Sequence, residues 1–554
     1  MRQRLGAVLV LVAMTGSSVM AQTSIERLEQ RYDSMCYLRD QLDVTRARGA
    51  PANLVGVSVE TLEAAYRVAW QVLGDELAAL RPPTLNLADR RVLGAVEEAY
   101  RRSPSPDSPG DSETAGECRP LPIPTGPPGL VMDSLQRAVY ACYAKAASAI
   151  VVDGDTLDRL TILGLLGTTD DRDRRERLWR ALDQVWSTVG GHGEPTSPYA
   201  TLVPIRRRAW AGKPTPMTQL ANTLGVSGNR AEAWLIRGLE AWRATLPDTL
   251  FEPWDVYYYT GAASRALSPR MTRDSLFAIN DRYYQSLGAD PRSLNVHYAN
   301  LPGKVPVAYS TFGATGRDQA GRWTRIEPWI FTGYRIGGFD NLNELLHETG
   351  HAVHVAAIRQ RPAFNDWPDS DVFTEGVADL ATLEMFEPGW QATFLGESVG
   401  LEEPIRAKYA GIVFDFAWAL FEIQVHRPGA PPANQVWTEI TRRYLKIRPH
   451  PEYSWWAARG QLINSPGYLS TYALGAFAVA DLRRTAAARF GSPTAGNARW
   501  YRGVSDALFR FGLARPARQV MEDFLGRAPS PVALLADLER IRTPGRRQTG
   551  RGSQ

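Results

Sequence analysis

Two histidines and a glutamate lie at a spacing that can bind and use a metal ion. His347 and His351 are four residues apart in the run Asn343–His354, and Glu348 directly follows the first histidine. On an α-helix, residues i and i+4 share one face, so both imidazoles can ligate one Zn²⁺. Glu348 can then accept a proton from a water molecule at the metal. Apolar residues around the motif indicate a buried helix, which Pro362 is expected to end.

A third ligand is expected from a second helix. Catalytic zinc usually has three protein ligands and one position for water. The segment Phe373–Phe386 carries an apolar stripe, and Glu375 and Asp379 are spaced to share one of its faces. Glu375 is the predicted third ligand, and Asp379 can accept the free ring N–H of a ligand histidine. The alternative is an ordinary solvated acidic pair. The expected cofactor is one Zn²⁺ per chain, held by His347, His351 and Glu375.

A further histidine, His354, lies on nearly the same helical face as His347 but two turns away, about 10 Å along the axis. One metal ion cannot reach both side chains unless the helix unwinds. His354 is therefore predicted either to support the metal ligands from behind or simply to pack in the core.

The motif and its surroundings resemble the gluzincin metallopeptidases. The run from His347 to His354 is similar to the HExGHAxH of the thimet oligopeptidase and oligopeptidase F family. The Glu-xxx-Asp pattern of Glu375 and Asp379 is similar to that of the angiotensin-converting enzyme family. The resemblance implies a mainly α-helical peptidase with a small β-sheet beside the HExxH helix. It also implies two helical halves around a deep channel, with zinc near the floor.

The resemblance extends in pieces from about residue 170 to residue 540. The segments Ile205–Trp210, Leu220–Gly225 and Pro253–Tyr258 are similar to the arginine-rich helix, the following turn and the PWDxxYY segment of the oligopeptidases. In Leu301–Phe331, apolar and polar residues alternate in some stretches, and β-branched and aromatic residues follow one another in others. Both patterns are typical of strands and predict a small sheet before the zinc helix. In gluzincins the edge strand of this sheet binds the substrate backbone. The alternative is a sheet that only supports the helix.

A third segment carries tyrosines that can assist peptide hydrolysis. The reaction builds negative charge on the carbonyl oxygen, and a positioned tyrosine O–H can donate a hydrogen bond to it. Gly467 and Tyr468, followed by Tyr472, resemble the Gly-Tyr-xxx-Tyr stretch that has this role in the oligopeptidases. Without the zinc motif, two tyrosines at this spacing are expected only to pack in a core.

The same segment is similar to the converting-enzyme pattern of a basic residue, a histidine two positions later and two tyrosines. Arg459 fits the basic position, which the resemblance assigns to binding the C-terminal carboxylate of a substrate. Gln461 stands where the histidine is expected. One donor to the transition state is therefore missing or replaced by an amide, and the loss of such a donor costs ~10²–10³ in rate.

The chain is expected to begin with an export signal. Residues 1–21 contain two arginines, a short apolar run and a small-residue cleavage site near Ala21, as secretory signal peptides do. Residues 22–200 are predicted to form an N-terminal helical region with a Pro/Ser/Gly-rich loop near 103–129. The catalytic region is assigned to residues 201–542, and residues 543–554 are assigned to a disordered tail.

Net charge, hydropathy and the number of cysteines limit which partners and which covalent bonds the protein is expected to have. A net charge of +4 over 554 residues is slight and argues against nucleic acid. No later segment approaches ~18 uncharged apolar residues, so stable membrane insertion is not expected. Cys36, Cys118 and Cys142 suit one disulfide and one free thiol, without indicating the pairing. The oligomeric state is not indicated.

These observations favour an exported zinc peptidase that hydrolyses short peptides, with release of C-terminal dipeptides as the specific hypothesis. One alternative is an oligopeptidase that cuts internally. Another, of a different class, is an exported binding protein that contains zinc but is not catalytic. Three ligands and a correctly placed base favour the open, catalytic kind of zinc site over the closed, structural kind.

Overall fold

The computed structural model describes residues 24–48, 58–80, 85–103, 128–302, 305, 308–314, 327–400 and 402–541. Within these ranges the protein is mainly α-helical with small β-sheets, as the sequence predicted. The predicted signal peptide, most of the predicted loop near 103–129 and the predicted tail lie outside the described residues.

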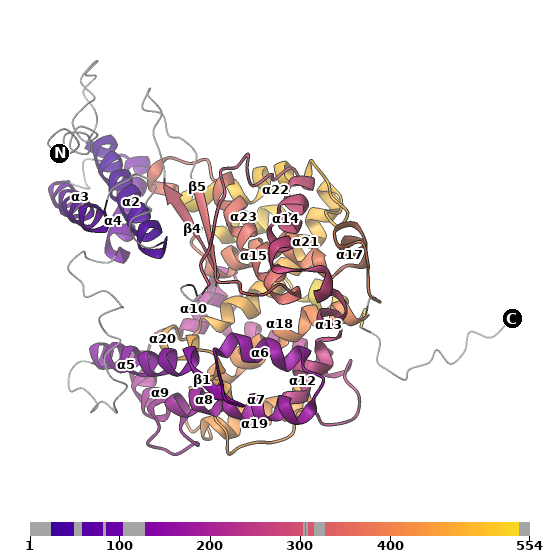
Figure 1. Cartoon of the computed structure of the whole chain (residues 1–554). Coiled ribbons are helices and arrows are strands. Elements are labelled where there is room, and N and C mark those ends of the chain that lie inside the picture. The colour runs from indigo at the N-terminus through magenta and orange to yellow at the C-terminus, as the bar shows by residue number, and fades with distance from the viewer. Residues whose placement is uncertain are drawn as a thin grey trace.

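Three N-terminal helices form a unit with its own hydrophobic core. They are α2 (Ser24–Arg48), α3 (Val59–Ala79) and α4 (Leu87–Arg102). Figure 1 shows this unit beside the strands β4 and β5. Its core includes Ala363 from the short 3₁₀ helix η3 (Pro362–Phe364), so the unit is attached to the rest of the protein by packing.

The remaining helices share one large core and form a lower and an upper group in Figure 1. The first group is in the lower half and the middle of the view: α5 (Pro128–Ser148), β1 (Ile150–Val152), β2 (Asp155–Leu157), α6 (Arg159–Thr168), α7 (Arg172–Ala181), α8 (Asp183–Gly190), α9 (Pro198–Ala209), α10 (Pro216–Thr223), α11 (Gly228–Arg243), α12 (Pro253–Thr260), α13 (Ala262–Leu267), η2 (Ser268–Arg270), α18 (Glu402–Val425), α19 (Ala433–Leu445), η5 (Trp455–Ala458) and α20 (Gln461–Asn464).

The upper group carries the zinc motif and the helices that pack around it. Its elements are α14 (Arg273–Ser286), β3 (His297–Asn300), β4 (Tyr309–Ala314), β5 (Glu327–Thr332), α15 (Phe339–Ala357), α16 (Asp371–Thr382), η4 (Leu383–Phe386), α17 (Pro388–Leu395), α21 (Leu469–Phe490), α22 (Trp500–Ala507), η6 (Phe509–Ala514), α23 (Ala517–Leu525) and α24 (Val532–Leu538).

Within the described residues, the sheet expected before the HExxH helix has three strands in the order β3-β5-β4. β5 pairs in parallel with β3 and antiparallel with β4. β4 is therefore an edge strand, and both β4 and β5 pack against α15. Two strands fall within the predicted segment, whereas β3 precedes it.

The zinc motif lies on α15, the long buried helix expected for it. The helix ends at Ala357, where Ile358 turns to an extended conformation, rather than at Pro362, which instead begins η3. The second predicted helix is α16 followed by the 3₁₀ helix η4. Cys36 is a free thiol and Cys142 is disulfide-bonded, whereas Cys118 lies outside the described residues.

Candidate metal centre and its cavity

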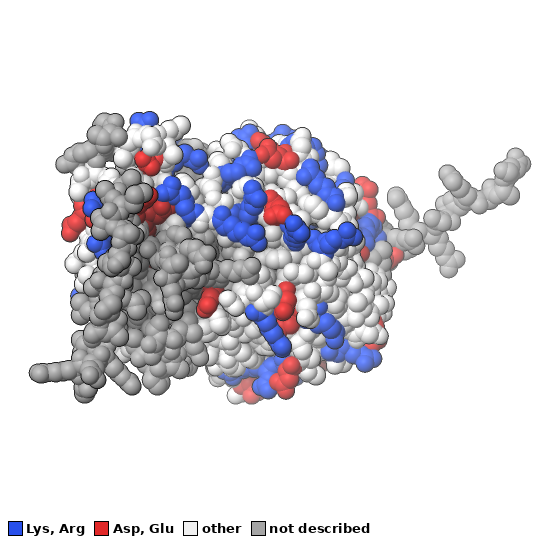
Figure 2. Space-filling model, turned by 90° about the horizontal axis from the view of Figure 1, so that it is seen from above, with Lys and Arg blue, Asp and Glu red and all other residues white. Residues whose placement is uncertain are grey.

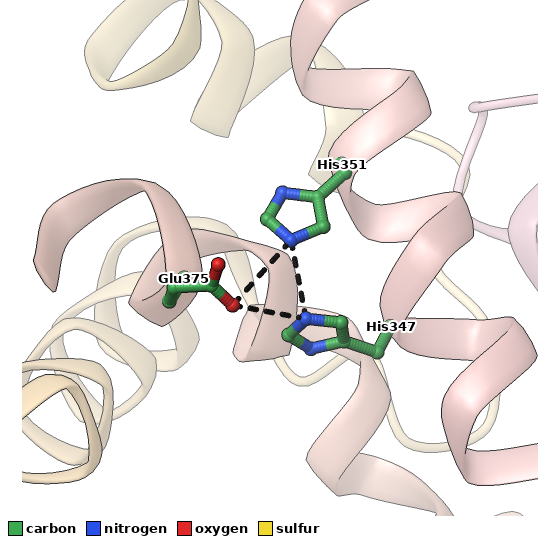
Figure 3. A group of neighbouring side chains, drawn as sticks. All are labelled: His347, His351 and Glu375. Atoms are coloured by element: carbon green, nitrogen blue, oxygen red, sulfur yellow. Dashed lines mark hydrogen bonds and ion pairs between the residues drawn. The ribbon is translucent and has the colours of Figure 1, made fainter. Parts of the chain in front are cut away.

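Three predicted ligand side chains converge between α15 and α16 (Figure 3). The Nε2 atoms of His347 and His351 are 3.1 Å apart. The Oε2 atom of Glu375 lies 3.3 Å from the Nε2 of His347 and 3.7 Å from the Nε2 of His351. The three atoms form a compact triangle, and all three side chains line the same cavity.

This triangle has the size that a zinc ion requires. Atoms bound at 2.0–2.1 Å and tetrahedral angles are about 3.3 Å from one another. The three observed separations of 3.1, 3.3 and 3.7 Å lie around that value. Two imidazoles and one carboxylate also form a common donor set for catalytic zinc. The three side chains therefore fit one Zn²⁺ ion, which they would hold at the wall of the cavity.

Glycines allow the helices to approach closely enough to build the triangle. A Cβ atom at Gly350, inside the motif, would lie 2.2 Å from the carbonyl oxygen of Ala378 on α16. On its other side α16 packs against α21, where a Cβ at Gly376 would lie 3.4 Å from the carbonyl oxygen of Gly475. α16 is thus held between two neighbours, and Glu375 lies within reach of both histidines.

Asp379 orients the first histidine. The Nδ1–H of His347 donates a hydrogen bond of 2.8 Å to Oδ1 of Asp379, which leaves Nε2 free to face the other ligands. Burial opposes the charged ring, but the carboxylates of Asp379 and Glu375 outweigh it and hold the pKa of His347 well above its usual value. Burial likewise opposes the carboxylate of Glu375, but the two imidazoles hold its pKa well below the ordinary range. The carboxylates of Glu375 and Asp379 thus stabilise positive charge at this site, either on the imidazole of His347 or on a bound cation.

Glu348 is buried beside the triangle and is held from the edge strand. Ser310 on β4 donates a hydrogen bond of 2.8 Å to Oε2 of Glu348. The same hydroxyl lies 2.8 Å from the backbone oxygen of Glu348. A carboxylate held in this way lines the cavity in a defined rotamer. The sequence placed Ser310 in a strand before the motif but gave no sign of this contact.

Both tyrosines of the third segment reach the centre. The Tyr468 hydroxyl donates to Oε1 of Glu375 at 3.1 Å, and the rings of Tyr468 and Tyr472 meet edge to face with centroids 5.4 Å apart. Burial, followed by the charge of Glu375, raises the pKa of each hydroxyl far above its usual value. Both hydroxyls therefore remain protonated and can act as hydrogen-bond donors.

A buried pair of charged residues holds the segment that carries Tyr468. The carboxylate of Glu422 on α18 accepts hydrogen bonds from the Gly467 backbone N–H at 3.1 and 3.2 Å. The fully buried Arg206 on α9 donates to the carbonyl oxygens of Leu462 and Ile463. Sequence reasoning noted Arg206 only as part of a family-like helix and did not identify Glu422. No local signal connects either residue to the site.

Arg459 lies on the wall of the cavity, whereas Gln461 is not among its lining residues. The Arg459 guanidinium lies over the rings of Trp418 and Tyr472 and 3.4 Å from Oδ1 of Asp415. Gln461 is half-buried at the start of the short helix α20. The structure therefore brings Arg459 to the site but does not bring Gln461 there.

His354 is buried one turn beyond the ligands and does not line the cavity. Among the described residues, neither of its ring nitrogens has a hydrogen-bond partner. Burial, followed by the charge of His351, lowers the pKa of His354 to about 3. Its ring packs near Phe509 and Trp367, and Trp367 in turn packs against His351. His354 is therefore a neutral packing residue, and Trp367 packs against both His354 and the ligand His351.

The centre opens into a cavity of about 830 Å³. Its walls come from α6, α12, α13, α15, α16, α18, the start of α21 and the strand β4. Pockets of this size hold small molecules or short peptides rather than folded proteins. The site is thus enclosed by elements far apart in the sequence.

No family model matches the chain, and no curated protein is significantly similar to it. None of the described helices combines the length and apolar character that a membrane span requires.

Proposed function

We propose that this protein is an exported, zinc-dependent peptidase of the gluzincin type that hydrolyses short peptides. The observation that carries the proposal is the zinc-sized triangle of His347, His351 and Glu375 beside a held carboxylate, Glu348, at the wall of a peptide-sized cavity. The pattern of residues 1–21 supports export. One Zn²⁺ per chain is the proposed cofactor.

Each residue of the site has a chemical task in this proposal. Bound zinc would supply a Lewis acid that polarises the scissile carbonyl and acidifies water. Glu348 takes the proton of the attacking water and returns it to the leaving amine, with Ser310 fixing its orientation. Tyr468 and Tyr472 donate hydrogen bonds to the carbonyl oxygen as it becomes negative. Asp379 keeps the Nε2 of His347 directed at the metal position.

Metal content and turnover of a mixed peptide library test the proposal together. Purified protein is expected to hold about one zinc per chain, and His351→Ala is expected to lose it. His192→Ala is the matched control, because His192 is exposed and lies outside the cavity lining. Full zinc retention in His351→Ala would contradict the assignment of the ligands.

The second variant separates metal binding from catalysis. Glu348→Gln keeps the size of the side chain and leaves the ligands unchanged, so zinc should remain while turnover falls by orders of magnitude. Near-normal turnover in the zinc-loaded variant would show that the base is elsewhere. Zinc-loaded wild type without any turnover would instead favour a non-catalytic zinc-containing protein.

A further inference from the structure

The charge of the cavity differs from that of the protein as a whole. The protein carries a net charge of +4, and basic side chains are more prominent than acidic ones on the face shown in Figure 2. The cavity lining instead holds carboxylates in excess, and among the described residues its lysine and arginine side chains are Lys408 and Arg459. These carboxylates are Asp340, Glu344, Glu348, Asp371, Glu375, Asp379 and Asp415. The charge of one zinc ion leaves the lining still acidic.

Several of these carboxylates have hydrogen-bond or ion-pair partners, whereas Asp371 and Asp340 have none among the described residues. Glu348, Glu375 and Asp379 are bound by neighbours in the centre, and Asp415 lies near Arg459. Asp371 lies in the first turn of α16 and is exposed. Across the described ranges, no side chain forms a hydrogen bond or ion pair with it. Arg102 is near enough to act on its charge but forms an ion pair with Glu98 at 3.7 Å instead.

A second polar group without a hydrogen-bond partner lies one turn further along the same face of α16. Thr374 is only 8% exposed, lines the cavity, and its Oγ1 has no hydrogen-bond partner among the described residues. Helical threonines commonly donate to the carbonyl oxygen four residues earlier. Thr349 and Thr382 do so at 2.8 and 3.1 Å, whereas Thr374 does not. A buried hydroxyl without a partner is costly, and a ligand N–H in the cavity would satisfy it.

An aromatic ring close to Asp371 in the sequence also lines the cavity. Trp367, four residues before Asp371, lines the cavity and packs against the ring of His351 with centroids 5.5 Å apart. Aromatic faces attract ammonium and guanidinium groups. We propose that Asp371, Thr374 and Trp367 form a subsite for a positively charged group of the substrate, an alkylammonium or a guanidinium. This inference rests on the proposed peptidase function and names its substrate class.

The subsite lies at the end of α16 away from Arg459. Asp371 and Asp379 are two turns apart, about 12 Å along the axis. The charge of Asp379 acts on Asp415, which Arg459 also faces. A short peptide with a cation at one end and a carboxylate at the other matches this arrangement. If Arg459 binds the C-terminal carboxylate, the cation lies on the N-terminal side of the cleaved bond.

Binding of matched peptides to zinc-loaded Glu348→Gln protein tests the subsite without turnover. The probes are fluorescent short peptides that differ only by lysine or norleucine, each with a free or an acetylated amino terminus. The cationic peptides are expected to bind about tenfold more tightly, the effect of one charge-assisted hydrogen bond. Loss of the preference on acetylation identifies the amino terminus as the ligand. Weaker binding when lysine is replaced by norleucine identifies the lysine side chain as the ligand.

Variants assign the preference to these residues. Asp371→Asn, made in the Glu348→Gln background, is expected to reduce the preference to about twofold or less, Thr374→Val to reduce it partly, and Asp371→Glu to restore it. Asp274→Asn is the matched control, since Asp274 is an exposed first-turn aspartate outside the cavity lining. Zinc content and Tm verify the fold of each variant.

The outcomes separate this subsite from the proposed function. Equal binding of all four peptides, including the acetylated norleucine peptide that carries no cation, would overturn the subsite even if the wild type cleaves them all. An unchanged preference in Asp371→Asn would overturn it as well. Binding that prefers cations and depends on Asp371, with no cleavage of any peptide by zinc-loaded wild type, would support the subsite and overturn the peptidase proposal.

Discussion

At the scale of single residues, Arg459 combines a fixed position with spare hydrogen-bond donors. Its guanidinium lies 5.3 Å from the ring of Trp418 and 5.6 Å from that of Tyr472, which limits its movement. Its Nε is buried without a partner among the described residues. Burial, which Arg459 only partly offsets, raises the pKa of the neighbouring Asp415 to about 6. Because the two rings hold its guanidinium at the wall of the cavity, we expect Arg459 to bind a substrate carboxylate without a change of side-chain conformation.

A comparison of free-acid peptides with their C-terminal amides tests this role. If Arg459 binds the C-terminal carboxylate, amidation should reduce kcat/KM of the wild type about tenfold or more, and should affect Arg459→Ala little. Arg442→Ala is a suitable control, because Arg442 is exposed and, within the described part of the chain, pairs with Glu439 on its own helix alone. Equal cleavage of acid and amide by the wild type would favour an oligopeptidase that cuts internally over release of C-terminal dipeptides.

Glu422 gives a prediction about pH. Burial, which the Gly467 N–H and the charge of Arg206 only partly offset, raises its pKa from 4.5 to about 7. The folded protein therefore favours the neutral acid. That stabilisation is complete below about pH 4.5 and is lost as the pH rises to about 7. Relative to Glu422→Gln, the wild type should lose on the order of 3 kcal/mol of unfolding free energy across this range.

Denaturant unfolding of wild type and Glu422→Gln at several pH values checks this expectation. Asp274→Asn is the control, because the Asp274 side chain is exposed and lies at the surface end of another helix, α14. A stability difference between wild type and Glu422→Gln that is the same at pH 4.5 and pH 8 would show that Glu422 does not titrate in this window.

At the scale of helices, the centre depends on how closely α15 and α16 approach. Gly350→Ala should separate the two helices, because its Cβ would lie 2.2 Å from a backbone oxygen that cannot rotate away. We expect a loss of zinc affinity of tenfold or more and a lower Tm. Gly94→Ala on α4 is the matched control, since beyond the adjacent backbone of α4 no atom of the described residues would lie within 4 Å of its Cβ, and alanine favours the helix. Unchanged zinc affinity in Gly350→Ala would show that the helices have room to move.

The sequence could indicate these two helices because their signals are local. The helical repeat places His347 and His351 on one face of α15, and Glu375 and Asp379 on one face of α16. The ligand number of zinc and the resemblance to the gluzincins, rather than the repeat, indicate that the two pairs meet. Gln461 shows the limit of that reasoning. The prediction for Gln461 rests only on its position two residues after Arg459. In the structure Gln461 begins the short helix α20, and its side chain is not among the residues that line the cavity.

Other parts of the site depend on contacts between distant segments. Ser310 meets Glu348 across 38 residues, and Glu422 meets Gly467 across 45. No repeat connects residues so far apart, because their approach is set by packing of the whole core. Trp367 and Thr374 were missed for a related reason: each is an ordinary helix or loop residue until the cavity is formed around it.

At the scale of the whole molecule, the N-terminal helices dock directly behind the site. α2 packs against β4, which carries Ser310, and against η3, which precedes Trp367. The buried carboxylate of Glu29 accepts bonds of 2.7 to 3.0 Å from Arg361 and from the Ala363 backbone N–H. This contact connects a unit with its own core to two cavity-lining segments. Loosening it should therefore affect the site as well as the unit.

Glu29→Ala tests the connection. Removing the carboxylate leaves the Ala363 N–H and Arg361 without their partner, which costs about 2 kcal/mol locally. We expect hydrogen exchange in α2 to become at least tenfold faster, while α18 in the main core is unchanged. We also expect kcat/KM to fall, because Ser310 and Trp367 lie on segments that α2 and η3 support. Glu63→Ala is the control, since Glu63 pairs with Arg46 inside the same unit and is exposed. Faster hydrogen exchange in α2 with unchanged kcat/KM would show that the docking of the N-terminal unit does not affect the geometry of the site.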